Sequence, residues 1–400
     1  MKLSQKVRDK LIYLRLKKNN VKVVKPSDNN KRTLFHYKNW SIDSDFLQFY
    51  NLNTFQNQKN FGENIFKSFM NLNLLTVFAV APTQSGKTGS MLSTIQHFYN
   101  SPHHHVPLNN IFIFTTHSSR EWLIQTKQRF PKKFENNIFH RNQIKTFIRN
   151  IRGKKNCLII FDESHIASSQ FQTMFRIYNA LGFYDSKHMF DNNIKIVHFT
   201  ATPKNIIHDA HAYWGNSFIT LNMNVPDSYV SLQNYMDNNQ ILQAKDLRTI
   251  ENVIDFKQYV SEDKPGYHII RTSRGKYHLQ TIDHFKNVFS SFNNPVFISE
   301  PLDKSFNFDV ILKIKPKVHT FIFIIDKIRC AKTIHIQFVH NLYERVSDNS
   351  EFSTIIQGLA GRATGYHKHV LHIRIFSHFK HISQFIYKTH PINYKRSFVL

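Results

Sequence analysis

The chain has 400 residues, and its 53 lysines and arginines outnumber its 27 acidic residues, for a formal net charge of +26 at pH 7. A hydrophobic content of 41% with 37 phenylalanines excludes a disordered chain and can fill two domain cores. So large a positive charge indicates a polyanionic partner, and nucleic acid is the first candidate.

The same composition excludes several other classes of protein. Two cysteines, Cys157 and Cys330, are too few for a disulfide scaffold, a four-cysteine iron–sulfur domain or a Cys₄ zinc site. No apolar run approaches the roughly 18 residues of a membrane span, and the N-terminus lacks the features of a secretory signal. We therefore expect a soluble intracellular protein with no membrane partner.

Residues 1–58 form a basic extension, and the sequence of residues 11–18 predicts a helix within it. The extension is either a nucleic-acid-binding arm or a solvated start to the fold, and the sequence favours neither. Further along, His103-His104-His105 lies in a loop flanked by prolines. Composition favours an exposed loop there over a metal-binding tract.

The first block that carries chemistry follows an apolar run at 74–80, which is typical of a buried parallel strand. Helical spacing follows the block, so backbone N–H groups and the positive end of a helix are expected to face an anion. Lys87 is then expected to reach the phosphates of ATP, and the Thr88 hydroxyl to bind Mg²⁺. The alternative is a chance loop. The block reads Ala81-Pro82-Thr83-Gln84-Ser85-Gly86-Lys87-Thr88.

The next strand, predicted at 111–114, is followed by a loop with hydroxyl groups and a cation, which suits contacts with the phosphates of a single strand. Trp122 either stacks on a base or packs its helix against the sheet, and the second is the commoner use of a large aromatic side chain.

A second chemical block follows the apolar run 157–161. Asp162 is expected to bind Mg²⁺, and Glu163 to orient and deprotonate the attacking water. His165 is a candidate link between this site and the opposite domain. An isolated Asp-Glu pair would indicate a solvated strand end; after a buried strand and downstream of the Lys87 loop it indicates a catalytic site.

The remaining elements alternate between strands and helices. Strands are predicted at 194–199, 267–270, 295–299, 320–325 and 338–342. This alternation predicts an α/β fold with two parallel-sheet lobes. The predicted parts are the extension 1–58, a first lobe at 59–225, a polar connection at 226–265 and a second lobe at 266–400.

The blocks, taken in order, resemble the motifs of superfamily 2 helicases of the DExH type. The Lys87 block is similar to motif I, Asp162-Glu163-Ser164-His165 to motif II, Thr200-Ala201-Thr202 to motif III, and Gln357 with Gly361-Arg362 to motif VI. Several segments also resemble the compact predicted helicases of large DNA viruses, namely 121–127, 140–142, 267–272 and 329–333.

The resemblance covers roughly residues 50–370 and implies two RecA-like lobes with a cleft between them. It implies a motor that hydrolyses ATP with Mg²⁺ while moving on or separating nucleic-acid strands. Gln357 and Arg362 would act from the second lobe, with Arg362 stabilising charge on the γ-phosphate. Gln56 or Gln58 would read the adenine, although each alone is equally an ordinary surface glutamine. If the chain is viral, the host cytoplasm or the virion is its expected location.

Three positions depart from the family pattern. Gln84 stands where such enzymes commonly have Gly, and motif V is recognisable only loosely at 328–333. In motif VI one extra residue separates Gln357 from Gly361, and Gly365 replaces a second arginine. Arg362 could therefore merely cap its helix or pair with a carboxylate at the lobe surface.

These departures keep two further functions open. One is a nucleic-acid-binding module with a switch-like nucleotide site. The other is the motor subunit of a larger viral replication or transcription assembly.

Overall fold

The computed structural model describes residues 54–70, 74–116, 120–163, 173–202, 210–303, 307–326, 328, 334–346, 352–366 and 372–389. The predicted helix at 11–18, His165 and the motif V-like residues 329–333 lie outside the described residues, as does the side chain of Trp122. No helix in the described ranges is long and apolar enough to cross a bilayer.

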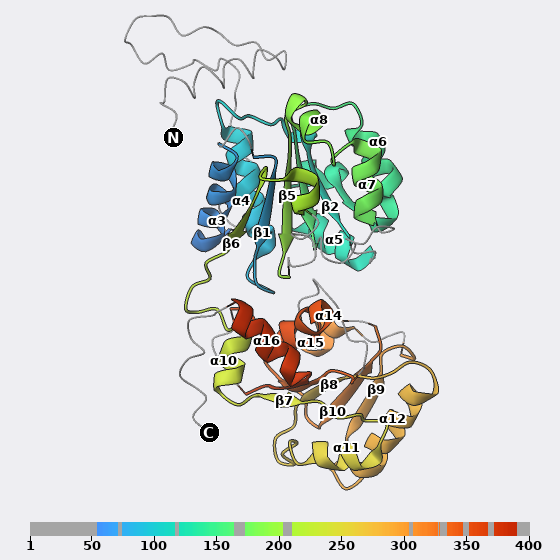
Figure 1. Ribbon diagram of the computed structural model, residues 1–400. Coiled ribbons are helices and arrows are strands. Elements are labelled where there is room, and N and C mark those ends of the chain that lie inside the picture. Colours follow the sequence, from blue (N-terminus) through green and yellow to red (C-terminus); the bar gives the residue numbers. More distant parts are fainter. Residues whose placement is uncertain are drawn as a thin grey trace, which may run out of the picture. The chain divides into compact units, whose positions relative to one another are not determined.

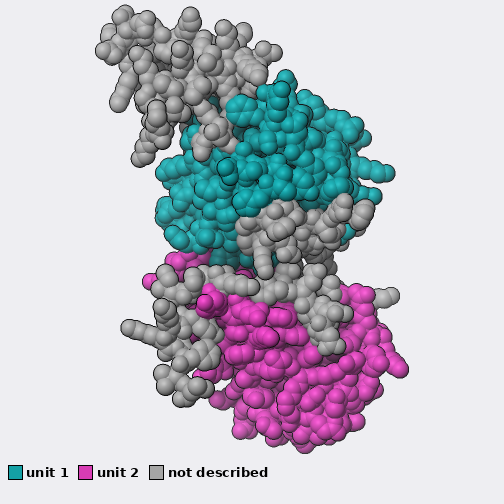
Figure 2. All heavy atoms as spheres, in the orientation of Figure 1, with its two compact units in different colours: residues 1–82, 86–224 teal, residues 83–85, 225–400 magenta. Residues whose placement is uncertain are grey.

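The chain divides into two compact units, which are coloured separately in Figure 2. The first comprises Met1–Pro82 and Gly86–Asn224, and the second comprises Thr83–Ser85 and Val225–Leu400. Each unit contains one six-stranded sheet, and every strand pairing in both sheets is parallel. The predicted α/β fold with two parallel-sheet lobes is confirmed.

The sheet of the first unit has the strand order β3-β2-β4-β5-β1-β6. Its central strands are buried on both faces, and all six residues of β4 are buried. The strands are β1 (Thr76–Val80), β2 (Ile111–Thr115), β3 (Ile138–His140), β4 (Cys157–Asp162), β5 (Ile194–Thr200) and β6 (Phe218–Asn222).

Helices cover both faces of this sheet (Figure 1). Alternate strand residues point to opposite faces, so each face presents side chains that the helices bury. On one face, Val77 and Ile160 belong to a core that includes residues of α3 and α4. On the other face, Phe78 and Phe161 belong to a core that includes residues of α6 and α7. The helices are α3 (Gln56–Ser68), α4 (Lys87–Asn100), α5 (Arg120–Gln128), α6 (Ile144–Ile151), α7 (Thr173–Leu181) and α8 (Ser186–Asp191), with 3₁₀ turns η1 (Leu108–Asn110), η2 (Lys132–Asn137) and η3 (Arg141–Gln143).

The sheet of the second unit has the order β7-β12-β11-β8-β10-β9. Residues of α11 and α12 form the core on one face, and residues of α10, α14, α15 and α16 contribute to the core on the other. The strands are β7 (Ile241–Gln243), β8 (Tyr267–Arg271), β9 (Val296–Ser299), β10 (Thr320–Ile324), β11 (Val339–Tyr343) and β12 (Arg374–Ser377). The helices are α10 (Leu232–Asp237), α11 (Ile250–Lys257), α12 (Lys276–Val288), α13 (Phe308–Ile311), α14 (Phe352–Gln357), α15 (Leu359–Ala363) and α16 (Phe379–Thr389).

The segment 226–265, predicted as a connection, contributes structure to the second unit. It contains α10, α11 and the strand β7, which pairs with β12. A three-residue strand is too short to show a period of two in the sequence, so composition alone suggested a polar connection.

His198 of β5 is a buried titratable group in the first unit. Its ring stacks against Phe78 at 4.9 Å and Phe161 at 5.2 Å between centroids, and its Nε2 lies 2.6 Å from the Tyr178 hydroxyl. Burial lowers the pKa of His198 to about 3. The folded chain therefore holds this ring neutral at pH values where an unfolded histidine takes up a proton.

We expect acid to destabilise the first unit through His198. The unfolded pKa is about 6.5, so the stabilisation is complete above that value and is lost as the pH falls towards the folded pKa. Between pH 6.5 and 5 the loss is on the order of 2 kcal/mol. In urea unfolding at a series of pH values, His198→Asn should show a shallower decline than wild type. His103→Asn, in an exposed turn, is the control, and identical slopes for wild type and His198→Asn would exclude this role.

Candidate functional site

The predicted phosphate loop connects β1 to α4 (Figure 1). The Ala81 N–H donates to the Thr200 carbonyl at 2.9 Å, which joins the start of the loop to the end of β5. Gly86 has φ 93° and ψ 38° immediately before Lys87, the first residue of α4. Only glycine adopts this left-handed conformation readily, so the turn into the helix explains this glycine.

Lys87 lies against the second of the two predicted catalytic carboxylates. Its Nζ is 2.8 Å from Glu163 Oε1, and the side chains are only 12% and 2% exposed. Asp162 ends β4, and Glu163 follows with φ 53°. The structure thus brings together the motif I lysine and the motif II acids, which lie 75 positions or more apart in the chain.

Thr116, directly after β2, supports the turn at Glu163. Its hydroxyl donates to the Glu163 carbonyl at 2.5 Å. A positive φ in a non-glycine residue costs on the order of 1–3 kcal/mol and persists where surrounding contacts impose it. Thr116 is therefore a positioning residue for Glu163. The loop that begins here was predicted to contact nucleic acid, and nothing in its sequence indicates the contact with Glu163.

The environment of Asp162 raises its pKa to about 7. Burial is the main cause and the Glu163 charge adds to it, while Lys87, the Glu163 backbone N–H and Arg129 oppose the rise. Arg129 follows α5 and belongs to none of the sequence blocks, so only its position in the fold identifies it. Two adjacent buried carboxylates are thus stable in their ionised forms only with positive charge nearby.

The Asp162 carboxylate fits a divalent cation. Its Oδ1 is buried and has no hydrogen-bond partner among the described residues. A carboxylate oxygen and a hydroxyl at the end of a phosphate loop are the protein ligands that Mg²⁺ uses beside phosphates. Thr88, the half-buried second residue of α4, supplies the hydroxyl.

Gln58, one of two candidate adenine-reading residues, lies beside the phosphate loop. A Cβ added at Gly86 would lie 2.0 Å from Gln58 Nε2, and one at Gly89 would lie 1.8 Å from Gln58 Oε1. Gln58 is 4% exposed, and its Oε1 accepts from the Phe55 N–H at 3.1 Å. Gln56 is exposed and donates to Asn60 instead.

The tip of the loop, Thr83–Ser85, groups with the second unit. Gln84 has φ 58°, and its Nε2 donates to the carbonyls of Gly361 at 3.0 Å and Arg362 at 2.7 Å. The Thr364 hydroxyl donates to the Thr83 carbonyl at 3.0 Å. Gln84 therefore adopts the backbone conformation that the usual glycine would have, and its side chain makes two hydrogen bonds that glycine lacks.

The motif VI residues lie at the junction of α14 and α15. Gln357 is fully buried and Arg362 is 3% exposed. Arg362 Nη2 donates to the Gln357 carbonyl at 3.3 Å. Gln357 is the last residue of α14, so this hydrogen bond is of the helix-capping kind, and the role of Arg362 at the γ-phosphate stays a prediction.

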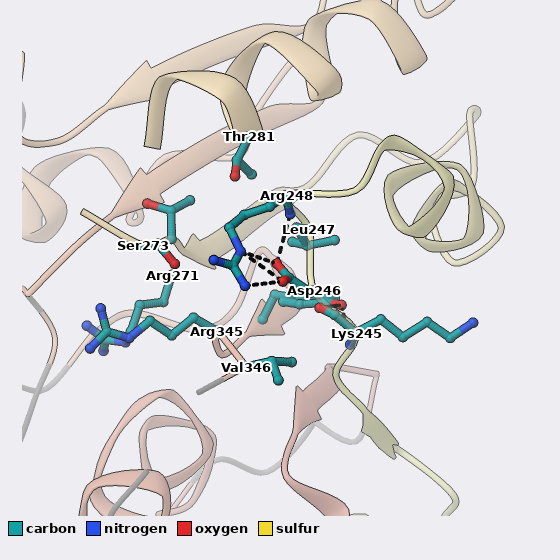
Figure 3. Close-up of a pocket in the computed structure, with 11 residues that line it drawn as sticks. Lys245, Asp246, Leu247, Arg248, Arg271, Ser273, Thr281, Arg345 and Val346 are labelled. Atoms are coloured by element: carbon teal, nitrogen blue, oxygen red, sulfur yellow. Dashed lines mark hydrogen bonds and ion pairs between the residues drawn. The ribbon is translucent and has the colours of Figure 1, made fainter. Parts of the chain in front are cut away.

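A hollow in the second unit, of about 260 Å³ including the part open to solvent, contains none of the predicted site residues (Figure 3). Arg248 and Asp246 face each other there, with Nε 2.9 Å from Oδ1 and 2.8 Å from Oδ2. Nearby, Arg271 Nε is 2.7 Å from Glu344 Oε1 and both side chains are buried. These cations are already matched by carboxylates.

The predicted His103–105 loop shows no metal site. His103 is exposed, and His105 Nδ1 lies 2.6 Å from the Tyr99 carbonyl. No group of three or more His, Cys, Asp or Glu side chains in the described ranges could hold a metal ion.

The chain was compared with known families, proteins and structures. No family model matches the chain. It is 28% identical over 322 residues to the uncharacterized protein L594 of Acanthamoeba polyphaga mimivirus, covering 73% of this chain and 77% of L594. The structure of the DEAD-box helicase Mss116 bound to ssRNA and UDP-BeF is similar, with a TM-score of 0.52 and 14% identity over 82% of this chain and 71% of that one. The structure of S. cerevisiae Dbp5 bound to RNA and ADP BeF3 has a TM-score of 0.49 and 13% sequence identity, and the match covers 87% of this chain and 90% of that one.

The chain, with its two parallel sheets, thus shares its fold with the Mss116 structure. The identity is low, so the likeness concerns the fold.

The contact between Gln58 and α4 generates a stability prediction. Gly89→Ala should destabilise the chain by about 1–3 kcal/mol, because the added methyl overlaps Gln58. In a Gln58→Ala background the same substitution should stabilise α4 by up to about 1 kcal/mol, the usual helical gain of Ala over Gly. Urea unfolding of the four proteins completes the cycle. A Gly89→Ala effect that is the same in both backgrounds would show that Gln58 does not fill this space.

Proposed function

We propose that this protein is an ATP hydrolase of the DExH helicase type that couples turnover to movement on nucleic acid or to strand separation. The observation that carries the proposal is the Lys87–Glu163 ion pair beside the buried Asp162 oxygen, which has no hydrogen-bond partner among the described residues. It lies at the carboxyl edge of a parallel sheet, where ligands bind in open α/β folds.

Lys87 and the backbone N–H groups of the loop would hold the ATP phosphates, and Gln58 would contact the adenine. Asp162 and Thr88 would hold Mg²⁺, which supplies positive charge to the phosphates when bound. Binding of phosphates would attract Lys87 away from Glu163, because both compete for one ammonium group. Glu163, held by Thr116, would then be available to orient and deprotonate water.

Nucleic acid is the proposed partner because the chain carries a net charge of +26. The structure of Mss116 named above contains ssRNA, which supports a nucleic-acid partner for a chain of this fold. The mimivirus relative favours a viral setting, in which the host cytoplasm or the virion would be the location and a larger replication or transcription assembly is a further candidate partner.

The catalytic assignment is tested with two variants of the ion pair. Lys87→Ala should weaken ATP binding by about 10- to 100-fold, since it removes a charged hydrogen-bond donor to ground-state phosphate. Glu163→Gln should bind ATP normally but lower kcat by about 10²–10⁴, the usual contribution of a general base. Binding is measured with a fluorescent ATP analogue, and turnover with saturating single-stranded DNA or RNA. Wild-type turnover in Glu163→Gln would refute its role as the base.

Arg362 is assigned to the developing charge on the γ-phosphate. Arg362→Ala should leave ATP affinity within a few-fold and lower kcat by about 10³ or more, because such an arginine acts on the transition state. Lys368→Ala, which removes the next cation in the sequence, is the control and should matter little. Near-normal turnover in Arg362→Ala would favour the nucleic-acid-binding module with a switch-like nucleotide site.

A further inference from the structure

The amino ends of the strands in the second unit form an edge that carries none of the motif residues. Tyr267, the first residue of β8, is level with Thr320 of β10 and Val339 of β11, and Thr320 is level with Val296 of β9. Figure 1 shows β8, β9 and β10 in one sheet. Since β8 has five residues, this edge lies ~17 Å from the carboxyl ends of the same strands.

A lysine-rich segment is anchored to this edge. The hydroxyl of the buried Tyr267 donates to the carbonyls of Ile311 at 2.8 Å and Ile314 at 3.0 Å. These hydrogen bonds fix the segment 312–319, between α13 and β10, next to the first residue of β8. Three exposed lysines extend from it at alternate positions: Lys313, Lys315 and Lys317.

Other cations lie along the same edge. Lys264 is exposed three residues before β8, and Arg374 is the first residue of β12. The pKa of His340, beside Gly266, is lowered to about 4, first by burial and then by electrostatic interaction with His372, His319, Arg374 and Lys264. These groups therefore lie close enough to act on one another.

Few acids offset this charge. The loop before Lys264 exposes Glu262 and Asp263. Within the described ranges, none of the four lysines at this edge forms an ion pair with a carboxylate. Exposed ammonium groups on flexible stems act as point charges for phosphates without requiring one fixed geometry.

We propose that this edge, defined by Lys264, Lys313, Lys315, Lys317 and Arg374, is a second nucleic-acid-binding surface that contacts the phosphates of a strand or duplex. The proposal rests on the proposed function, which already brings a long polyanion to the chain. The surface lies apart from the carboxyl edge of its own sheet. It binds without sequence preference, because phosphates carry no sequence information.

The test compares wild type with Lys313→Ala/Lys315→Ala/Lys317→Ala in binding a 40-nucleotide oligo(dT) by fluorescence anisotropy at several salt concentrations. Each lost contact with a single strand lowers the slope of log affinity against log salt by about 0.7, so the triple variant should lose about two. The matched control, Lys132→Ala/Lys155→Ala/Lys187→Ala, removes three exposed lysines of the first unit. Its slope should stay within about 0.5 of wild type. ATP turnover without nucleic acid should be unchanged in both variants, which also verifies their folding.

Equal slopes for wild type and the two triple variants would overturn the second surface and leave the proposed function intact. Unchanged binding of oligo(dT), with loss of binding to phosphatidylserine vesicles, would instead assign the edge to a membrane. If wild type binds neither DNA nor RNA, the proposed function fails together with this surface.

Discussion

The Lys87–Glu163 ion pair is the interaction on which the candidate site depends. Two adjacent carboxylates end the buried strand β4, and moving an unpaired charge out of water costs several kcal/mol. The Lys87 ammonium, 2.8 Å from Glu163, offsets part of that cost and fixes the start of α4 against the end of β4. On the proposed function, phosphate and carboxylate would compete for one cation, so the pair would link nucleotide binding to the freedom of Glu163.

The sheet provides the remaining constraints. In the strand order, β5 lies between β4 and β1, and the Ala81–Thr200 hydrogen bond joins the phosphate loop to the end of β5. Thr116 joins β2 to the turn at Glu163. Residues from four separate sequence blocks are therefore held by hydrogen bonds to backbone carbonyls at one sheet edge.

Strands with continuous apolar runs could be predicted from the sequence, because burial on both faces leaves a run that no amphipathic helix would have. The central strands β1, β4 and β10 are of this kind, and β5 and β8 are apolar apart from Lys195 and His198 in β5 and His268 and Arg271 in β8. The strands β3, β6, β7 and β12 were not predicted. β3 and β7 have three residues each, β12 begins with Arg374, and the edge strand β6 is only half-buried. Short or half-exposed strands give no periodic signal, and only pairing with a neighbour defines them.

The candidate site likewise has residues that the sequence predicts and contacts that it does not. The phosphate loop and the two acids are contiguous in sequence, so their chemistry could be predicted from the residues. Gln56 and Gln58 could not be separated, although two residues differ by about 200° around a helix and so face opposite sides. Only the packing of α3 on α4 shows that Gln58 faces the phosphate loop. The contacts of Thr116 and Gln84 likewise join residues far apart in sequence.

The location of the net charge also requires the structure. The sequence gives +26 for the whole chain, which indicates a polyanion but not where it binds. Several cations of the described units are neutralised locally: Lys87 by Glu163, Arg271 by Glu344 and Lys245 by Asp255. Ion pairs of this kind hold the fold together and contribute little to the outer field. Exposed lysines that form no ion pair within the described ranges contribute to the remaining charge, and 313–317 places three of them on one anchored segment. On the proposed function, attraction of nucleic acid and binding of nucleotide would depend on different sets of cations, so substitutions in one set should leave the other function measurable.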